Sequence, residues 1–164
     1  MSYSNRHSSI VSRQSVADIM RIISGKYRGR KLLGPSGLDL RPTGDRLKES
    51  LFSIFGSEVN SAVVLDVFAG TGAIGIEALS RGARQTVFIE SATSACRLIR
   101  RNAEICGIAT GYRIVQQDVF KALRFLGREG FKANIVFFDP PYDFEPYGDL
   151  LDITFTRGLA AQTA

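Results

Sequence analysis

The sequence predicts an α/β protein with a doubly wound parallel sheet. From residue 62 onward, short apolar runs of strand length alternate with segments at helical spacing, as in a parallel sheet flanked by helices. The first and last of these runs, residues 63–67 and 133–138, are continuously hydrophobic, which is typical of strands buried on both faces. A length of 164 residues fits one domain with a substantial core and, at most, a small appendage.

The first nineteen residues stand apart from this pattern. Residues 1–17 contain six serines, two arginines and the only histidine of the chain, but no acidic residue. We predict that residues 1–19 form a disordered leader, because they offer few large apolar side chains for a core. An organellar transit peptide is the alternative interpretation of a serine- and arginine-rich, acid-poor start.

Residues 20–58 form the predicted appendage. The strand-like runs 20–24 and 30–33 flank the sequence GKYRG, whose glycines permit a turn, so we expect a basic hairpin. A helix is expected from about Asp45 to Phe55, with Thr43 as its N-cap. We expect the apolar stripe of this helix to pack on the main domain.

The main domain, residues 59–164, contains the alternating elements. Gly82 and Gly107 follow two of the predicted helices and stop them, and Ser91 is expected to cap the start of another. No fifth strand is recognisable after Tyr142, so we expect the sheet to be incomplete at its carboxyl-terminal end. The predicted strands are residues 63–67, 86–90, 112–116 and 133–138, and the predicted helices are 73–81, 91–106, 119–126 and about 147–157.

Composition excludes several classes of protein. Hydrophobic residues make up 45% and charged residues 23% of the chain, as in ordinary soluble domains. Asp66 and Asp139 interrupt the two most apolar segments, so no run approaches the roughly 18 residues that span a bilayer. Cys96 and Cys106 lie on one predicted helix at a spacing that suits neither a zinc cluster nor a disulfide framework. We therefore expect a reduced, cytoplasmic protein with no membrane segment and no metal.

Positive charge is concentrated in the predicted appendage. Between Met20 and Lys48 there are eight lysines and arginines against two aspartates, an excess of six in a chain whose net charge is +5. A local basic field of this kind usually meets a polyanion, although a well-solvated face is the alternative.

A glycine-rich loop follows the first predicted strand of the main domain. The sequence from Gly70 to Gly75 reads GTGAIG and matches G-x-G-x-x-G between a strand and a helix, and Glu90 follows Gly70 by 20 positions. This is the pattern of a dinucleotide-binding fold, with the acid on a ribose hydroxyl. It fits S-adenosylmethionine equally well, since a nicotinamide dinucleotide and S-adenosylmethionine both carry an adenosine.

Three features favour S-adenosylmethionine over a nicotinamide cofactor. Asp66, four residues before the first glycine, would repel a pyrophosphate but suits the ammonium group of a methionine moiety. Asp118 can accept a hydrogen bond from the adenine amino group, with a helix cap as the alternative role. A Pro-Pro pair after the fourth strand has no evident use in hydride transfer. We expect Gly75 to serve close helix packing rather than ligand contact.

The sequence from Asp139 to Tyr142, DPPY, indicates chemistry on an amino group of a base. An exocyclic amine is a poor nucleophile because its lone pair is delocalised into the ring. Hydrogen bonds accepted by the Asp139 carboxylate and the Pro140 carbonyl would favour a pyramidal nitrogen whose lone pair faces the sulfonium methyl. The prolines restrict the backbone and so fix these acceptors in advance. A plain strand terminator is the alternative interpretation.

The identity of the base is suggested by two residues of the same motif. Tyr142 can stack on a base extruded from its helix, a contact worth about 1–3 kcal/mol. Asp139 tilts the choice toward guanine, whose N1–H and N2 amine are two adjacent donors for one carboxylate, whereas an amide would suit adenine better.

These segments resemble the bacterial RsmD-like enzymes, which methylate N2 of a guanine in 16S ribosomal RNA. The resemblance covers roughly residues 20–157 and includes MRIISGKYRGRKL, LRPTGDRLKESLFSIF, LDVFAGTGAIGIEALSRGA, VFIE, QQDVF and FFDPPY. It implies a Rossmann-like methyltransferase fold with an N-terminal basic hairpin and helix. It also implies S-adenosylmethionine as the methyl donor and a small-subunit ribosomal substrate.

The resemblance also assigns roles by position. It implies that Asp139, Pro140 and Tyr142 hold the guanine. From their charge we expect Arg28, Arg30, Arg41 and Arg46 to meet RNA phosphates. The residues that the resemblance implies for the cofactor are Asp66, Phe68, Gly70, Gly72, Glu90 and Asp118.

The leading hypothesis is therefore methylation of a guanine N2 amine in 16S ribosomal RNA, free or in a 30S assembly intermediate, by a monomeric enzyme. Methylation of an adenine N6 amine or of another amino group uses the same kind of loop and stays open. A shortened, inactive protein that binds RNA through the hairpin is the third hypothesis.

Overall fold

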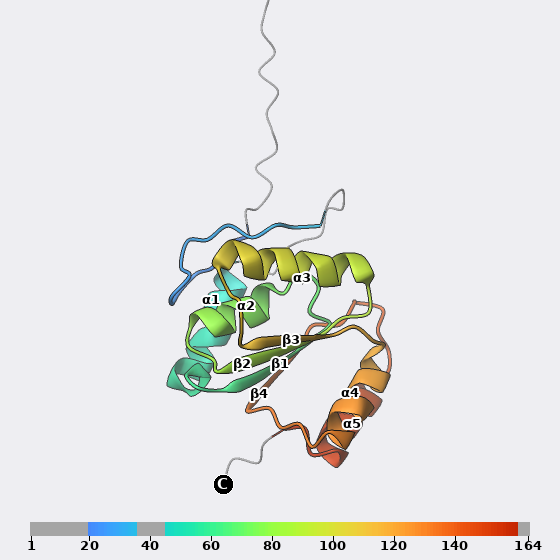
Figure 1. The fold of residues 1–164 in the computed structure, drawn as a ribbon. Coiled ribbons are helices and arrows are strands. Elements are labelled where there is room, and N and C mark those ends of the chain that lie inside the picture. Colours follow the sequence, from blue (N-terminus) through green and yellow to red (C-terminus); the bar gives the residue numbers. More distant parts are fainter. Residues whose placement is uncertain (1–19, 36–44, 161–164) are drawn as a thin grey trace, which may run out of the picture.

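The computed structural model describes residues 20–35 and 45–160. The predictions for the leader, for the Thr43 cap and for Arg41 lie outside these residues. The elements, drawn in Figure 1, are α1 (Asp45–Phe55), the 3-10 helix η1 (Gly56–Val59), β1 (Val63–Val67), α2 (Ala73–Ser80), β2 (Gln85–Ile89), α3 (Thr93–Cys106), β3 (Tyr112–Val115), α4 (Val119–Arg128), β4 (Ile135–Phe138) and α5 (Tyr147–Thr156).

The four strands form one parallel sheet in the order β3-β2-β1-β4. The chain winds outward from β1 to β3 and then returns to place β4 on the other side of β1. This reversal makes the carboxyl ends of β1 and β4 a topological switch point, the place where open α/β sheets bind ligands. At that edge Val67 pairs with both Ile89 and Phe138, so the loops after β1, β2 and β4 start side by side.

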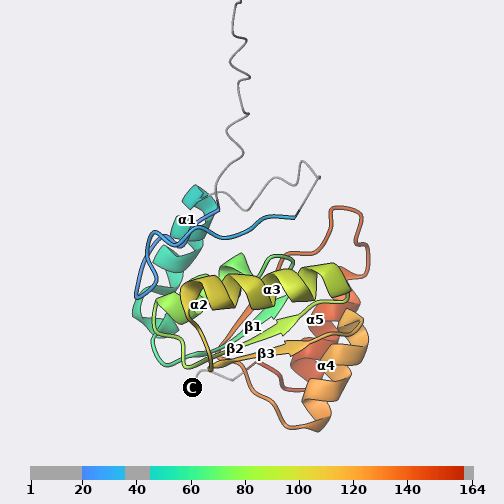
Figure 2. The same ribbon diagram turned by 45° about the horizontal axis from the view of Figure 1, so that its top comes forward.

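Helices cover both faces of the sheet. The hairpin, α1, α2 and α3 lie on one face, and α4 and α5 lie on the other (Figures 1 and 2). Side chains alternate accordingly along β2, where Phe88 packs toward α2 and α3 while Val87 and Ile89 pack toward α4 and α5. The predicted architecture, a doubly wound α/β sheet with an N-terminal hairpin and helix, is confirmed.

The N-terminal segment forms the expected hairpin and packs on the domain. Ile22 N–H donates to Arg30 O at 2.9 Å, and Leu32 N–H donates to Met20 O at 2.8 Å. Met20, Ile22 and Leu32 are buried in the same hydrophobic cluster as residues of α2 and α3. The Lys48 ammonium, buried in α1, donates to the carbonyl of Arg21 and so joins α1 to the hairpin.

Buried polar side chains fix the position of the hairpin. Glu77 of α2 is buried, and its carboxylate accepts hydrogen bonds from Ile23 N–H at 2.8 Å and Ser24 N–H at 3.0 Å. Near the turn, Tyr27 N–H donates to the Ser80 hydroxyl at 2.9 Å. Because Ser80 ends α2, the turn of the hairpin lies at the amino edge of the sheet, opposite the switch point.

Two of the predicted helix boundaries are shifted by two residues in the structure. Helix α3 begins at Thr93 after Ala92, which makes no side-chain capping bond, so the prediction of a Ser91 cap was wrong. Helix α4 continues past the predicted end at residue 126 to Arg128. It includes Gly127, where an added Cβ would come within 2.9 Å of the Arg157 side chain. This glycine permits close contact between the end of α4 and the residue that follows α5.

The chain also begins to pair beside β4, which the sequence did not predict. Ala133 and Ala160 form an isolated parallel bridge, and Ala133 N–H donates to Leu159 O at 2.7 Å. Leu159 is fully buried in the cluster that also contains Leu150. Among residues 20–35 and 45–160, no helix combines the length and apolar character needed to cross a bilayer.

Candidate active site

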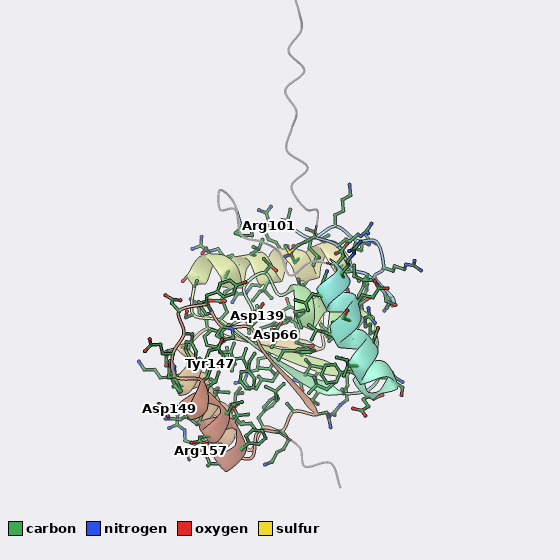
Figure 3. All side chains as sticks on the ribbon, turned by 180° about the vertical axis from the view of Figure 1, so that it is seen from behind. Asp66, Arg101, Asp139, Tyr147, Asp149 and Arg157 are labelled. Atoms are coloured by element: carbon green, nitrogen blue, oxygen red, sulfur yellow. The ribbon has the colours of Figure 1, made fainter. Side chains whose placement is uncertain are left out.

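Two loops leave the sheet at the switch point: residues 68–72 after β1, the first loop, and residues 139–146 after β4, the second loop. The first residue of the second loop remains tied to β1, since Asp139 N–H donates to Val67 O at 3.3 Å. Figure 3 shows Asp66, within β1, close to Asp139. The two loops that the sequence singles out therefore lie beside one another.

Left-handed backbone makes the first loop turn sharply into α2. Phe68 has a φ of 63°, Gly70 of 53° and Gly72 of 75°. At Gly72 an added Cβ would also press on the Ile99 side chain at 3.1 Å. Phe68 is not a glycine, and this conformation costs a residue with a Cβ about 1 kcal/mol or more. Contacts of the Phe68 ring therefore have to offset the free-energy cost of this backbone conformation.

Glu90, directly after β2, joins the first loop to the start of α3. One oxygen of its carboxylate accepts a hydrogen bond from Gly70 N–H at 2.9 Å, and the other accepts from Ala92 N–H at 2.8 Å. A carboxylate has about four acceptor sites, so each oxygen retains capacity for a further donor. The side chain is half-buried at the loop, where a ribose hydroxyl could reach it.

Asp66 lies inside the sheet rather than at its open edge. It is 3% exposed, and its carboxylate accepts a hydrogen bond from Gly75 N–H at 2.9 Å. Burial raises the pKa of Asp66 to about 7, the Gly75 hydrogen bond opposes this rise, and the charges of Asp139 and Glu90 add to it. The Asp66 carboxylate thus holds the beginning of α2 beneath the first loop.

The packing role of Gly75 is confirmed. A Cβ at this position would lie 2.3 Å from the Phe88 ring and 2.6 Å from the Thr86 methyl group. Helix α2 can therefore approach β2 only because residue 75 has no side chain.

Asp118 caps α4. Its side chain accepts a hydrogen bond from Lys121 N–H at 3.2 Å, so the alternative interpretation of this residue as a helix cap holds in the structure. The position, three residues after β3, is on the same edge of the sheet as the first loop. Contact with an adenine stays a prediction.

The second loop presents its residues to solvent. Asp139 is exposed, Pro140 is half-buried, and the Tyr142 side chain is fully exposed. An aromatic ring held out from the surface in this way is available for stacking on a flat ligand.

Phe144 anchors the second loop, and the sequence reasoning missed it. Its ring lies 5.0 Å from the Phe68 ring in a T-shaped contact, 6.3 Å from Phe120 in a stacked one, and 5.5 Å from Tyr147. The signal available in the sequence was an aromatic residue two positions after Tyr142, close to a further tyrosine. Phe144 connects the two loops directly, because Phe68 belongs to the first.

The part of the chain that the structure describes includes three of the arginines that were expected to meet RNA. Arg28 and Arg30 are exposed on the hairpin and Arg46 is exposed on α1. The turn that carries Arg28 is bonded to the end of α2, at the opposite edge from Asp139. An RNA that contacts both must extend across the molecule.

The part of the chain that the structure describes contains no group of three histidine, cysteine or acidic side chains placed to hold a metal ion. An open hollow of about 230 Å³ between α4 and α5 is lined by Phe120, Arg124, Asp149 and Ile153. None of these four is a predicted site residue.

Residues 20–163 match the family described as Conserved hypothetical protein 95. The chain is 42% identical over 123 residues to Ribosomal RNA small subunit methyltransferase D of Escherichia coli K12, which covers 75% of this chain and 60% of that protein. It is 35% identical over 134 residues to YlbH of Bacillus subtilis 168, covering 82% of this chain and 73% of the relative.

Among solved structures, yhhF from Escherichia coli aligns with a TM-score of 0.74 and 38% identity, covering 86% of this chain and 75% of the other. This chain thus spans about three fifths of the length of the Escherichia coli methyltransferase D. The family match includes the hairpin, the two loops and the sheet between them, and the chain belongs to the Conserved hypothetical protein 95 family, that of the RsmD-like ribosomal RNA methyltransferases.

Proposed function

We propose that this protein transfers the methyl group of S-adenosylmethionine to the N2 amine of a guanine in small-subunit ribosomal RNA. The observation that carries the proposal is the position of the two loops on one edge of the sheet, with Val67 paired to Phe138 at their origin. A donor over the first loop and a base over the second would be neighbours there.

The residues of the first loop fit the cofactor. At Gly70 the left-handed backbone leaves open space, with only the Phe68 carbonyl near an added Cβ, at 3.9 Å. Glu90 adds a carboxylate with spare acceptors for ribose hydroxyls. Asp66, Phe68, Gly72 and Asp118 complete the proposed cofactor set. When bound, S-adenosylmethionine supplies an electrophilic methyl group on a sulfonium.

The residues of the second loop act on the base. The Asp139 carboxylate accepts hydrogen bonds from the guanine N1–H and N2 amine, and the Pro140 carbonyl accepts the second amine proton. These bonds favour a nitrogen whose lone pair faces the methyl group, and the rigid prolines hold the acceptors in place before the base arrives. Tyr142, fully exposed, stacks on the extruded base.

The relatives support the substrate class. The name of the Escherichia coli relative gives ribosomal RNA of the small subunit as its substrate. We extend this to a monomeric protein that needs no metal and acts on 16S ribosomal RNA or on a 30S assembly intermediate. The exposed arginines of the hairpin and α1, Arg28, Arg30 and Arg46, and Arg41 between them, are proposed to bind its phosphates.

A methyl-transfer assay tests the proposal. The full chain is incubated with labelled S-adenosylmethionine and either 16S ribosomal RNA or 30S particles that lack the modification, and the nucleosides are then analysed. We expect N2-methylguanine; N6-methyladenine would replace the proposed base, and no transfer despite cofactor binding would refute the activity of this chain.

Asp139→Ala provides the internal control for the chemistry. Turnover should fall at least 100-fold, as is typical when a group that stabilises the reacting atoms is removed. Calorimetry should show nearly unchanged binding of S-adenosylmethionine, because the proposed cofactor contacts are elsewhere. Equal losses of turnover and cofactor binding would contradict the role assigned to Asp139.

A further inference from the structure

The hairpin and the segment from the second loop through α5 carry opposite charge. Residues 20–35 contain five lysines and arginines and no acid, whereas residues 139–156 contain five acids and no lysine or arginine. The hairpin lies on the α3 side of the sheet, and α5 lies on the opposite side (Figure 2). A polyanion is attracted to the hairpin.

Helix α3 extends the basic side of the molecule. Its buried residues, among them Ile99 and Ala103, face the sheet, and its outer surface carries Arg97, Arg100 and Arg101, all exposed. Within the described residues, no carboxylate lies within 4.0 Å of these three guanidinium groups. Their charge is therefore available for a ligand, with Glu104 the only acid on the helix.

This surface is continuous with the hairpin. The second hairpin run follows α3, since Leu33 N–H donates to the Asn102 side chain at 2.7 Å and Leu33 O accepts from it at 3.1 Å. Figure 3 shows Arg101 on the outer side of α3 beside the hairpin.

Helix α3 also begins at the carboxyl edge of the sheet, where the two loops lie. Thr93, its first residue, follows Glu90 closely, and α3 then runs back across the sheet for 14 residues, about 21 Å. The basic turn of the hairpin lies at the far end of this path, next to Ser80. One route for an RNA from the hairpin to Asp139 on this face of the sheet passes over α3.

We propose that Arg97 and Arg101, one turn apart on the outer surface of α3, bind the phosphates of the RNA between the hairpin and the target guanine. The inference rests on the proposed function, to which it adds the path of the substrate. Arginine suits this role because its planar guanidinium can make two parallel hydrogen bonds to a phosphate.

A pair of double variants tests the path. R97Q/R101Q removes two charges from α3, and R124Q/R128Q removes two charges at the same spacing from α4, where both arginines are also exposed but on the opposite face. Binding of fluorescently labelled, transcribed 16S ribosomal RNA to the full chain is measured by anisotropy at several salt concentrations. Calorimetry with S-adenosylmethionine checks that each variant retains the cofactor site.

We expect R97Q/R101Q to weaken RNA binding at least 10-fold and to reduce the slope of log affinity against log salt by about 1.4–1.8, as for two lost phosphate contacts. R124Q/R128Q should bind RNA like the wild type. Equal losses in both variants would overturn the path, since net charge alone would then explain binding. Failure of the wild type itself to bind the RNA would refute the RNA substrate, and the path with it, while cofactor binding would survive.

Discussion

The Glu90 carboxylate accepts the backbone N–H of Gly70 at 2.9 Å, although 20 positions separate the two residues along the chain. This hydrogen bond connects the end of β2 to the first loop. It fixes the glycine backbone and the carboxylate relative to each other before any ligand is bound. The glycine and the acid whose spacing identified the motif in the sequence are thus in direct contact in the structure.

Glu90→Ala should weaken cofactor binding about 10- to 100-fold, because hydrogen bonds to a charged group contribute about 1.5–3 kcal/mol. Glu90→Gln retains one oxygen for Gly70 N–H but loses the charge and one acceptor, so an intermediate loss is expected. Calorimetry with S-adenosylmethionine measures both variants. An unchanged affinity in the alanine variant would remove Glu90 from the proposed cofactor set.

Asp66→Asn should change how stability depends on pH. With a folded-state pKa of about 7 against 3.8 in the unfolded chain, ionisation of Asp66 is disfavoured by folding, so its contribution to stability is present below pH 4 and is lost as pH rises to about 7. Asparagine can still accept the Gly75 hydrogen bond but does not titrate.

The free energy of unfolding of the Asp66→Asn variant minus that of the wild type should therefore be larger at pH 8 than at pH 5 by about 3 kcal/mol. Urea unfolding at the two pH values measures the difference, in which the other titrating groups cancel. A difference between variant and wild type that stays constant with pH would show that Asp66 titrates normally.

Phe144→Ala should release the second loop from Phe68 and Phe120. Aromatic contacts of this kind contribute about 0.5–1.5 kcal/mol each beyond the area they bury. We expect turnover to fall about 10-fold while the cofactor affinity changes less, because Asp139 and Tyr142 lose their fixed position. Phe155→Ala, which removes a 67% exposed ring on α5, is the matched control and should retain activity. Steady-state kinetics with saturating cofactor separates the two variants.

Alanine substitutions at two glycines near helix starts should change stability in opposite directions. Gly75→Ala places a Cβ 2.3 Å from Phe88 and should destabilise the fold by about 1–3 kcal/mol. Gly148→Ala, in α5, meets nothing within 4 Å and should stabilise it by up to about 1 kcal/mol. Chemical denaturation of the two variants measures both effects. Equal changes of the same sign would mean that helix propensity, not close approach, decides the cost at residue 75.

The sequence predicted the sheet well because its strands are buried on both faces and read as continuous apolar runs. All four strands and the helices between them lie within a few residues of the predicted bounds. Two errors concern helix ends. Ser91 does not cap α3, and α4 continues through Gly127, where the Arg157 side chain occupies the space that a Cβ would need.

Long-range contacts of the site were beyond reach from the sequence. Periodicity shows which side of a helix is buried, but it does not show the partner. Nothing in the local pattern indicates that Glu77 accepts the backbone N–H groups of Ile23 and Ser24, 54 and 53 positions away. For the same reason the contact between Phe144 and Phe68 was missed, and so was the place of the hairpin turn at the edge away from Asp139.

The left-handed conformation of Phe68 has a thermodynamic consequence for the whole site. Its backbone shapes the first loop, while its ring rests on Phe144 of the second. A ligand that immobilises one loop therefore also restricts the other loop. The second ligand to bind then costs less conformational entropy. We expect donor and acceptor to bind with positive cooperativity, and by linkage each should strengthen the other by the same factor.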